Sequence, residues 1–186
     1  MKKGQESRTI ELCKTLEAMV DNTRDVYLNS NEDNKAFMQT VIGAALRYLP
    51  NQSDSFSGYI SKELLLQYFI NGTKETSKSE EHIFPRKISA KELFEILDLS
   101  DGYVLSLYKE RYCKLSYITP EENKKAIQFQ KVGRFSNPKN TYLSAGIKLV
   151  HISNEEWNMV KRNNKQVIEE LLKRDESYPE FEMQVA

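Results

Sequence analysis

The chain has 186 residues, with 27 basic and 27 acidic side chains, so its formal net charge at neutral pH is zero. This balance excludes a protein-wide positive field that gathers nucleic acid without specificity, and any site for a polyanion must be local. Two cysteines are too few for a disulfide framework or a zinc knuckle. Because no apolar run approaches the ~20 residues of a membrane span and the N-terminus has no signal-like segment, we expect a cytoplasmic protein without a membrane partner.

The first part of the chain is predicted to be helical. Apolar residues recur at helical spacing over residues 9–27 and again over residues 35–49. Farther along, Ser61 has a side chain that can cap a helix N-terminus, and it precedes a short apolar pattern over residues 62–70. We therefore expect a helical N-terminal region over residues 1–72.

The middle segment, residues 73–132, is predicted to mix short strands with helices. A strand-like apolar run lies at residues 82–84, and residues 89–92 have the hydroxyl and carboxylate spacing of a capping box, which predicts a helix beginning there. A further helix is predicted over residues 103–111, and the alternating pattern of residues 113–118 predicts a second strand. The expected order is therefore a strand, helices and a second strand.

The sharpest boundary in the sequence follows this second strand. Thr119 suits the N-cap position, and Pro120 follows at the first helical position, where its missing N–H costs nothing. Glu122 has the spacing to close a capping box, and Asn123 falls in the first turn of the helix. Glu121 and Glu122 are interpreted as capping and helix-dipole carboxylates rather than as ligands.

The C-terminal segment, residues 133–186, is predicted to begin with irregular structure. Residues 133–140 form a basic loop with glycine and proline, and residues 141–152 suggest two short strand pieces. A third capping box at residues 153–156 predicts a final helix that ends near Arg174, before an acidic tail.

The chain resembles the HNH family of endonucleases in two stretches, residues 81–86 (EHIFPR) and residues 118–123 (ITPEEN). Members of this family have an acidic residue and a histidine at the end of a first strand, followed by a hydrophobic-x-proline pattern. They carry the last histidine or asparagine of the motif on a helix. The resemblance covers roughly residues 79–130 and requires a helical insertion between the two strands. It implies an α+β protein in which a ββα-metal finger core lies between a helical N-terminal region and a C-terminal helix.

The resemblance also implies roles for three residues. Glu81 and Asn123 would hold one divalent cation, and His82 would be the general base that takes a proton from the attacking water. The chemistry agrees, because a neutral imidazole is the side chain best matched to accept a proton near neutral pH. A carboxylate and an amide carbonyl are hard oxygen ligands, which suit Mg²⁺ or Mn²⁺. The family's middle asparagine, which lies before the helix, has no counterpart in this sequence.

Cationic and amide side chains near the two stretches predict contacts with a phosphate backbone. They are Arg86, Lys87, Lys124, Arg134, Asn137 and Lys139. The resemblance thus implies metal-dependent hydrolysis of DNA phosphodiester bonds, and small enzymes of this family commonly act in restriction or phage defence. A double-strand cut would favour a homodimer with one site for each strand.

Two other functions fit the sequence. The chain could be a noncatalytic helical module that binds nucleic acid or protein, in which the Glu-His-x-x-Pro pattern has no chemical role. It could also be a nuclease toxin that cleaves RNA instead of DNA. The second histidine, His151, lies between apolar neighbours and is interpreted as a packed or surface residue rather than a catalytic one.

Overall fold

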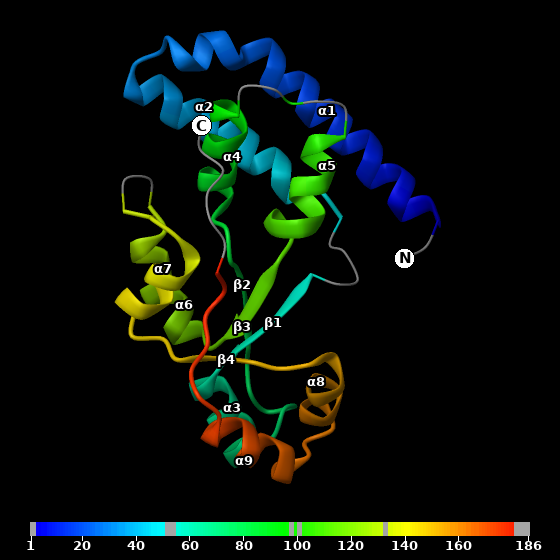
Figure 1. Cartoon of the computed structure of the whole chain (residues 1–186), viewed down its shortest axis with the longest axis vertical. Coiled ribbons are helices and arrows are strands. Elements are labelled where there is room, and N and C mark those ends of the chain that lie inside the picture. The colour runs from blue at the N-terminus through cyan, green and yellow to red at the C-terminus, as the bar shows by residue number, and fades with distance from the viewer. Residues whose placement is uncertain (1–2, 51–54, 97–98, 100–101, 132–133, 181–186) are drawn as a thin grey trace. The chain divides into compact units, whose positions relative to one another are not determined.

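The computed structural model describes residues 3–50, 55–96, 99, 102–131 and 134–180. These residues form helices and one four-stranded sheet, which confirms the expected α+β class (Figure 1). They divide into two compact units that alternate along the chain. The first unit contains the described residues up to Ser55 and residues 84–114, whereas the second contains residues 56–83 and 115–180 of the described chain. Residues 181–186 of the expected tail lie outside the described residues.

The first unit is helical. Its segments are α1 (Lys3–Leu28), α2 (Glu32–Arg47), α4 (Arg86–Glu95), α5 (Tyr103–Leu107) and the π-helical turn η1 (Tyr108–Tyr112). The two predicted N-terminal helices are confirmed as α1 and α2. α2 begins where the Asn31 side chain accepts a hydrogen bond from the N–H of Asn34 at 2.9 Å. Its acidic first turn and Arg47 in its last turn complement the helix dipole.

The helix α4 begins earlier than the sequence predicts. It starts directly after Pro85, whose ring holds φ at −58°, a value that suits helix entry. Ser89 and Glu92 therefore lie inside the helix, where both are buried, and the predicted capping box between them is wrong. The Glu92 carboxylate instead accepts hydrogen bonds from Arg111 Nη1 and the Tyr112 hydroxyl, each at 2.9 Å. A tertiary contact thus uses the side chain that local spacing assigned to a cap.

The second unit is built on a mixed sheet. Its strands are β1 (Phe56–Ser61), β2 (Ser79–His82), β3 (Leu115–Ile118) and β4 (Leu149–His151), in the spatial order β2-β3-β1-β4. β3 runs antiparallel to β2 and parallel to β1, and β4 runs antiparallel to β1. The helices of this unit are α3 (Lys62–Asn71), α6 (Pro120–Ala126), α7 (Pro138–Ser144), α8 (Asn154–Lys161) and α9 (Lys165–Lys173), with the 3-10 turn η2 (Ile127–Phe129) after α6. None of the helices in the described part of the chain combines the length and the apolar character needed to cross a bilayer.

Two apolar clusters pack on opposite faces of this sheet. On the first, which we call the α3 face, Val150 of β4 packs with residues from α3, α8 and α9. On the second, which we call the α6 face, Ile118 of β3 and Leu149 of β4 pack with Ala126 of α6 and with Tyr142 of α7. Successive strand residues point to opposite faces, and Leu149 and Val150 therefore lie in different clusters.

The C-terminal part of the chain contains more helix than the sequence predicts. Pro138 starts α7 inside the stretch expected to be a loop, with Asn137 as its N-cap. Residues 141–152 contain the end of α7 and the strand β4 instead of two strand pieces. The predicted final helix is divided into α8 and α9, because Asn163 takes a positive φ of 59° and Asn164 caps α9.

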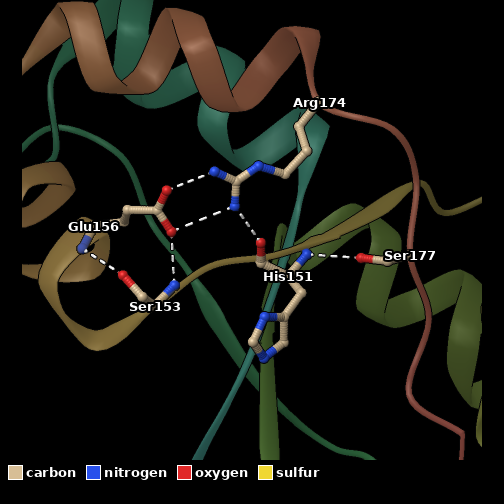
Figure 2. A network of polar contacts seen from close by, with 5 residues as sticks. All are labelled: His151, Ser153, Glu156, Arg174 and Ser177. Atoms are coloured by element: carbon tan, nitrogen blue, oxygen red, sulfur yellow. Dashed lines mark hydrogen bonds and ion pairs between the residues drawn. The ribbon is translucent and has the colours of Figure 1, made fainter.

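The predicted capping box of α8 is confirmed, and the end of α9 holds it in place (Figure 2). The Ser153 hydroxyl accepts from the N–H of Glu156 at 3.1 Å, and the Glu156 carboxylate accepts from the N–H of Ser153 at 2.7 Å. Arg174 donates to both carboxylate oxygens of Glu156 and, at 2.6 Å, to the backbone oxygen of His151. The Ser177 hydroxyl accepts from the N–H of His151 at 2.8 Å. The segment after α9 is therefore tied to both backbone groups of one residue of β4.

Candidate functional site

The strand, strand and helix of the proposed site occur in the expected order in the second unit. β2 and β3 pair antiparallel, with Glu81 opposite Ser116 and His82 opposite Leu115. β3 leads through Thr119 directly into α6. The chain between β2 and β3 contains α4 and α5, so the helical insertion that the resemblance requires is present.

A buried group of hydrogen bonds fixes the N-terminus of α6. The Thr119 hydroxyl accepts from the N–H of Glu122 at 3.1 Å, and a Glu122 carboxylate oxygen accepts from the N–H of Thr119 at 2.9 Å. This oxygen also accepts from the Ser61 hydroxyl at 2.6 Å, which links α6 to the start of α3. Ser61 in turn caps α3 by accepting from the N–H of Leu64 at 3.1 Å. The predicted caps of both helices are confirmed, and they set the position of Asn123 in the first turn of α6.

Glu81 lies on the α6 face and is 6% exposed. Its pairing partner Ser116 shares a face of the sheet with Ile118, which belongs to the α6-face cluster. Gln130, which follows η2, donates a hydrogen bond from Nε2 to the Glu81 carboxylate. Burial and, after it, the negative charge of Glu81 raise the pKa of the Tyr142 hydroxyl above its ordinary value. The Tyr142 phenol therefore keeps its proton at neutral pH.

Asn123 presents a buried oxygen from α6, the helix that packs against β2. Its side-chain Oδ1 is shielded from solvent and accepts no hydrogen bond from the residues that the structure describes. Buried polar atoms nearly always have a partner, and leaving an acceptor without one costs about 1–3 kcal/mol. A donor or a cation from outside the chain would therefore be stabilised at this oxygen. Since α6 covers the face on which Glu81 lies, the two proposed ligands are on the same side of the sheet.

His82 is the last residue of β2 and leaves the strand on the side opposite Glu81, because adjacent strand residues alternate. Its pairing partner Leu115 shares that face of β3 with Tyr117, which packs against the α3-face cluster. The structure therefore brings Glu81 and Asn123 to one side of the sheet and places His82 on the other.

Sequence reasoning misses two polar residues of this region, Ser116 and Gln130, whereas it interprets Tyr142 as a core residue or a contact to bases. Ser116 and Tyr142 are almost completely buried. Gln130 lies beyond the end of α6 and after η2, so helical spacing from Asn123 does not identify it. Ser116 gives a signal, because it is a polar residue inside a short apolar strand.

The predicted phosphate contacts are divided between the two units. Arg86 and Lys87 form the first turn of α4 in the first unit. Lys124 lies on α6 and Arg134 lies between η2 and α7, and both are exposed in the second unit. Lys124 is thus the predicted cation nearest in the chain to the proposed ligand Asn123.

Lys139 lies in α7 and Asn137 is the N-cap of that helix, whereas the sequence predicts a loop at both residues. The Asn137 side chain accepts from the N–H of Asn140 at 2.8 Å and caps the helix. Lys139 Nζ lies 2.9 Å from Glu180 Oε1 in an exposed ion pair. Exposed pairs of this kind are held by little free energy, so Lys139 can exchange its carboxylate partner for a phosphate.

The proposed donor set is one carboxylate and one amide oxygen. Within the described ranges, the structure has no group of three or more histidine, cysteine, aspartate or glutamate side chains placed to hold a metal ion. The pair of Glu81 and Asn123 is a different kind of set, in which water and phosphate oxygens would fill the remaining positions of a hard cation. The buried Oδ1 of Asn123, which has no hydrogen bond from the described residues, fits such a cation.

Comparison with models of protein families, with curated proteins and with solved structures found no match for this chain.

Proposed function

We propose that the chain is a metal-dependent nuclease that hydrolyses DNA phosphodiester bonds on a ββα-metal core formed by β2, β3 and α6. The observation that carries this proposal is the buried Oδ1 of Asn123, which accepts no hydrogen bond in the described part of the chain. A cation at this oxygen would satisfy it. Glu81, on the same side of the sheet, supplies the negative charge that a divalent cation requires.

The residues around Glu81 support a ligand role. Gln130 donates a hydrogen bond to the carboxylate and orients it, as the outer partners of metal ligands do. Tyr142, which burial keeps protonated, adds a neutral hydroxyl near the same carboxylate. With Glu81 and Asn123 as its protein ligands, Mg²⁺ or Mn²⁺ would neutralise the charge that develops on the scissile phosphate and on the leaving oxygen.

His82 is the proposed general base. It lies at the point where β2 ends and the chain continues into Ile83. A general base must come within hydrogen-bond reach of the attacking water in the substrate complex, and catalytic hydrogen bonds often tighten only when the substrate is bound. Substitution of His82 is therefore the direct test of its role.

The DNA backbone would contact Lys124 beside the ligand Asn123, together with Arg134 and Lys139 in the same unit. Arg86 and Lys87 are proposed as further contacts from the first unit. Such contacts fix the position of the duplex and carry no sequence information themselves. Restriction or phage defence is the proposed biological role, and a homodimer would place one site on each strand.

A noncatalytic module that binds nucleic acid is the second candidate, and one observation favours it. Glu81 and His82 leave β2 on opposite faces, whereas a metal ligand and a base that act on one water must converge. In such a module, ordered water would donate to the buried Oδ1 of Asn123.

A cleavage assay separates these functions. The purified protein is incubated with supercoiled plasmid DNA or with single-stranded RNA, in Mg²⁺ or in excess EDTA, and the products are resolved on gels. We expect DNA cleavage that requires Mg²⁺, and His82→Ala should lower its rate by ~10²–10⁴ because the base is lost. Asn123→Ala and Glu81→Ala should weaken Mg²⁺ binding in calorimetry, and more Mg²⁺ should partly restore cleavage for at least one of them.

Matched controls use the same residue types at exposed positions of the second unit. His151→Ala and Asn158→Ala should cut DNA at the wild-type rate. Cleavage that continues undiminished in EDTA would remove the cation from the mechanism. DNA binding without cleavage would support the noncatalytic module, and consumption of RNA instead of DNA would support the RNA-cleaving alternative.

A further inference from the structure

The helices α1 and α2 of the first unit leave an apolar groove open to solvent. The groove has a volume of about 930 Å³, and its lining includes Met19 and Val26 from α1 and Phe37 and Val41 from α2. Phe37 is 65% exposed and Val26 is 57% exposed. Apolar side chains that gather on one face mark contact sites, whereas singly scattered ones do not.

The exposed face of α2 has the spacing of a coiled-coil seam. Its positions are Asn34, Phe37, Val41, Ala44 and, at the C-cap, Tyr48, and all five are exposed. Alternating steps of three and four residues separate them. A seam with this spacing lets two helices pack side by side, because each side chain fills a space between side chains of the other helix.

The charges beside this seam make α2 complementary to itself. Asp33, Thr40 and Arg47 lie at seven-residue intervals on one flank of the seam. When two copies of α2 pack antiparallel, Asp33 of each copy faces Arg47 of the other, and the two Thr40 residues meet near the axis. In a parallel pair, this flank would instead face Met38 and Ala45 of the other helix, and the opposite charges would not meet. In the described residues neither Asp33 nor Arg47 forms an ion pair, so both charges are available for such contacts.

We propose that this groove is the docking surface for a second copy of the chain, with two α2 helices packed antiparallel across a two-fold axis near Thr40 and Val41. The α1 helices flank the pair, so the interface is a four-helix arrangement. A two-fold contact requires one patch to complement itself, and the placement of Asp33 and Arg47 meets this requirement. The helix of another protein would have to reproduce a charge pattern that α2 already contains. This inference does not depend on the proposed nuclease activity.

The test measures the mass of the full chain in solution by sedimentation equilibrium over a wide range of concentrations. We expect a dimer for the wild-type chain. Phe37→Asp should raise the dissociation constant of the dimer by tenfold or more, because it places a charge in the centre of an apolar contact. Ile70→Asp is the matched control, since Ile70 is 64% exposed on α3 in the second unit. It should leave the dissociation constant unchanged.

A charge exchange tests the antiparallel geometry itself. Asp33→Arg should weaken the dimer, because it faces Arg47 of the other copy, and adding Arg47→Asp should restore much of the lost affinity. Circular dichroism checks that α2 remains helical in each variant. A monomeric wild-type chain at every concentration would overturn the proposal. A dimer that Phe37→Asp leaves intact, or that the double exchange fails to rescue, would also overturn it, whether or not the chain cleaves DNA.

Discussion

Each unit contains a glutamate–arginine pair of close geometry, and the two pairs differ in their access to water. In the first unit, Glu92 Oε1 lies 2.9 Å from Arg111 Nη1, and the side chains are 0% and 7% exposed. In the second unit, Glu156 Oε1 lies 2.5 Å from Arg174 Nη2, and the exposed fractions are 27% and 41% (Figure 2). By distance alone, the second pair would be expected to contribute more to stability. Burial reverses this order, because a charge removed from water depends on its partner far more than a charge that water still contacts.

The carboxylates of Glu92 and Glu156 also differ in their other hydrogen-bond partners. Glu92 also accepts from the Tyr112 hydroxyl at 2.9 Å, and burial raises the pKa of Tyr112, so this phenol remains a donor. The guanidinium of Arg111 lies 4.4 Å from the centre of the Phe84 ring. Glu156 has backbone partners instead, in the capping box of α8. The buried pair thus joins side chains of α4 and η1, whereas the exposed pair fixes the ends of α8 and α9.

The largest expected effect is the loss of the buried pair. Glu92→Ala should lower the free energy of unfolding of the first unit by ~3–5 kcal/mol, because it removes the Glu92 carboxylate from the buried Arg111 side chain. Glu156→Ala is the matched variant in the second unit and should cost less than about 1 kcal/mol for the ion pair. During urea denaturation, fluorescence of the single tryptophan, Trp157, reports on the second unit, whereas far-ultraviolet circular dichroism reports on the helices of both units. The part of the circular-dichroism transition that Trp157 does not follow therefore measures the first unit. Equal losses in the two variants would show that burial does not control the contribution of these pairs.

A smaller effect is expected from the arginine of the exposed pair. Arg174→Ala should lower the stability of the second unit by about 1 kcal/mol, since it removes hydrogen bonds to Glu156 and to the backbone oxygen of His151. Arg174→Lys keeps the charge but loses the planar fork, and should restore only part of this loss. Urea titration monitored by Trp157 fluorescence measures both variants. Full recovery in the lysine variant would mean that charge alone accounts for the contact.

The smallest effect concerns pH. The hydrogen bond from Arg174 is the main cause that lowers the pKa of Glu156 below its usual value of 4.5. A carboxylate whose pKa is lower in the folded state stabilises that state above the unfolded pKa, and this stabilisation is lost as the pH falls through the folded pKa. We therefore expect the melting temperature of the second unit to fall below pH 4.5 by more in the wild-type chain than in Glu156→Gln. Identical acid profiles would exclude this contribution.

The predicted helix ends that the structure confirms are those at which the capping side chain and its partner are close together in the sequence. Ser61, Thr119 and Ser153 each bind a backbone N–H three residues away, so the sequence alone contains the information. Ser89 and Glu92 have the same spacing, but Glu92 is used by partners from η1. The strand β1 is missed, because it lies within the N-terminal region expected to be helical and residues 51–58 have the composition of a loop; residues 51–54 lie outside the described residues. The pairing partners of β1 lie far along the chain, where local patterns give no information.

The order of the elements around the candidate site was predictable from the sequence, but their geometry was not. The strand predicted at residues 82–84 is wrong in position, since β2 covers Ser79–His82 and residues 83–84 lie outside it. The pairing of β2 with β3 decides which of its side chains faces α6. A shift of one residue in a strand exchanges its two faces. The burial of Glu81, the contact from Gln130 and the separation of His82 depend on this register, which the neighbouring residues alone do not determine.

The parallel pairing of β1 with β3 also sets an order of events during synthesis. Phe56 pairs with Leu115, and the last helices of the first unit are made between these two residues. The ribosome therefore makes the described residues of the first unit before it makes β3, and we expect this unit to fold first. During this interval β1 is an unpaired strand, and the late closure of a long loop makes its pairing slow. At this stage the unpaired edge of β1 can pair with the strands of other nascent chains.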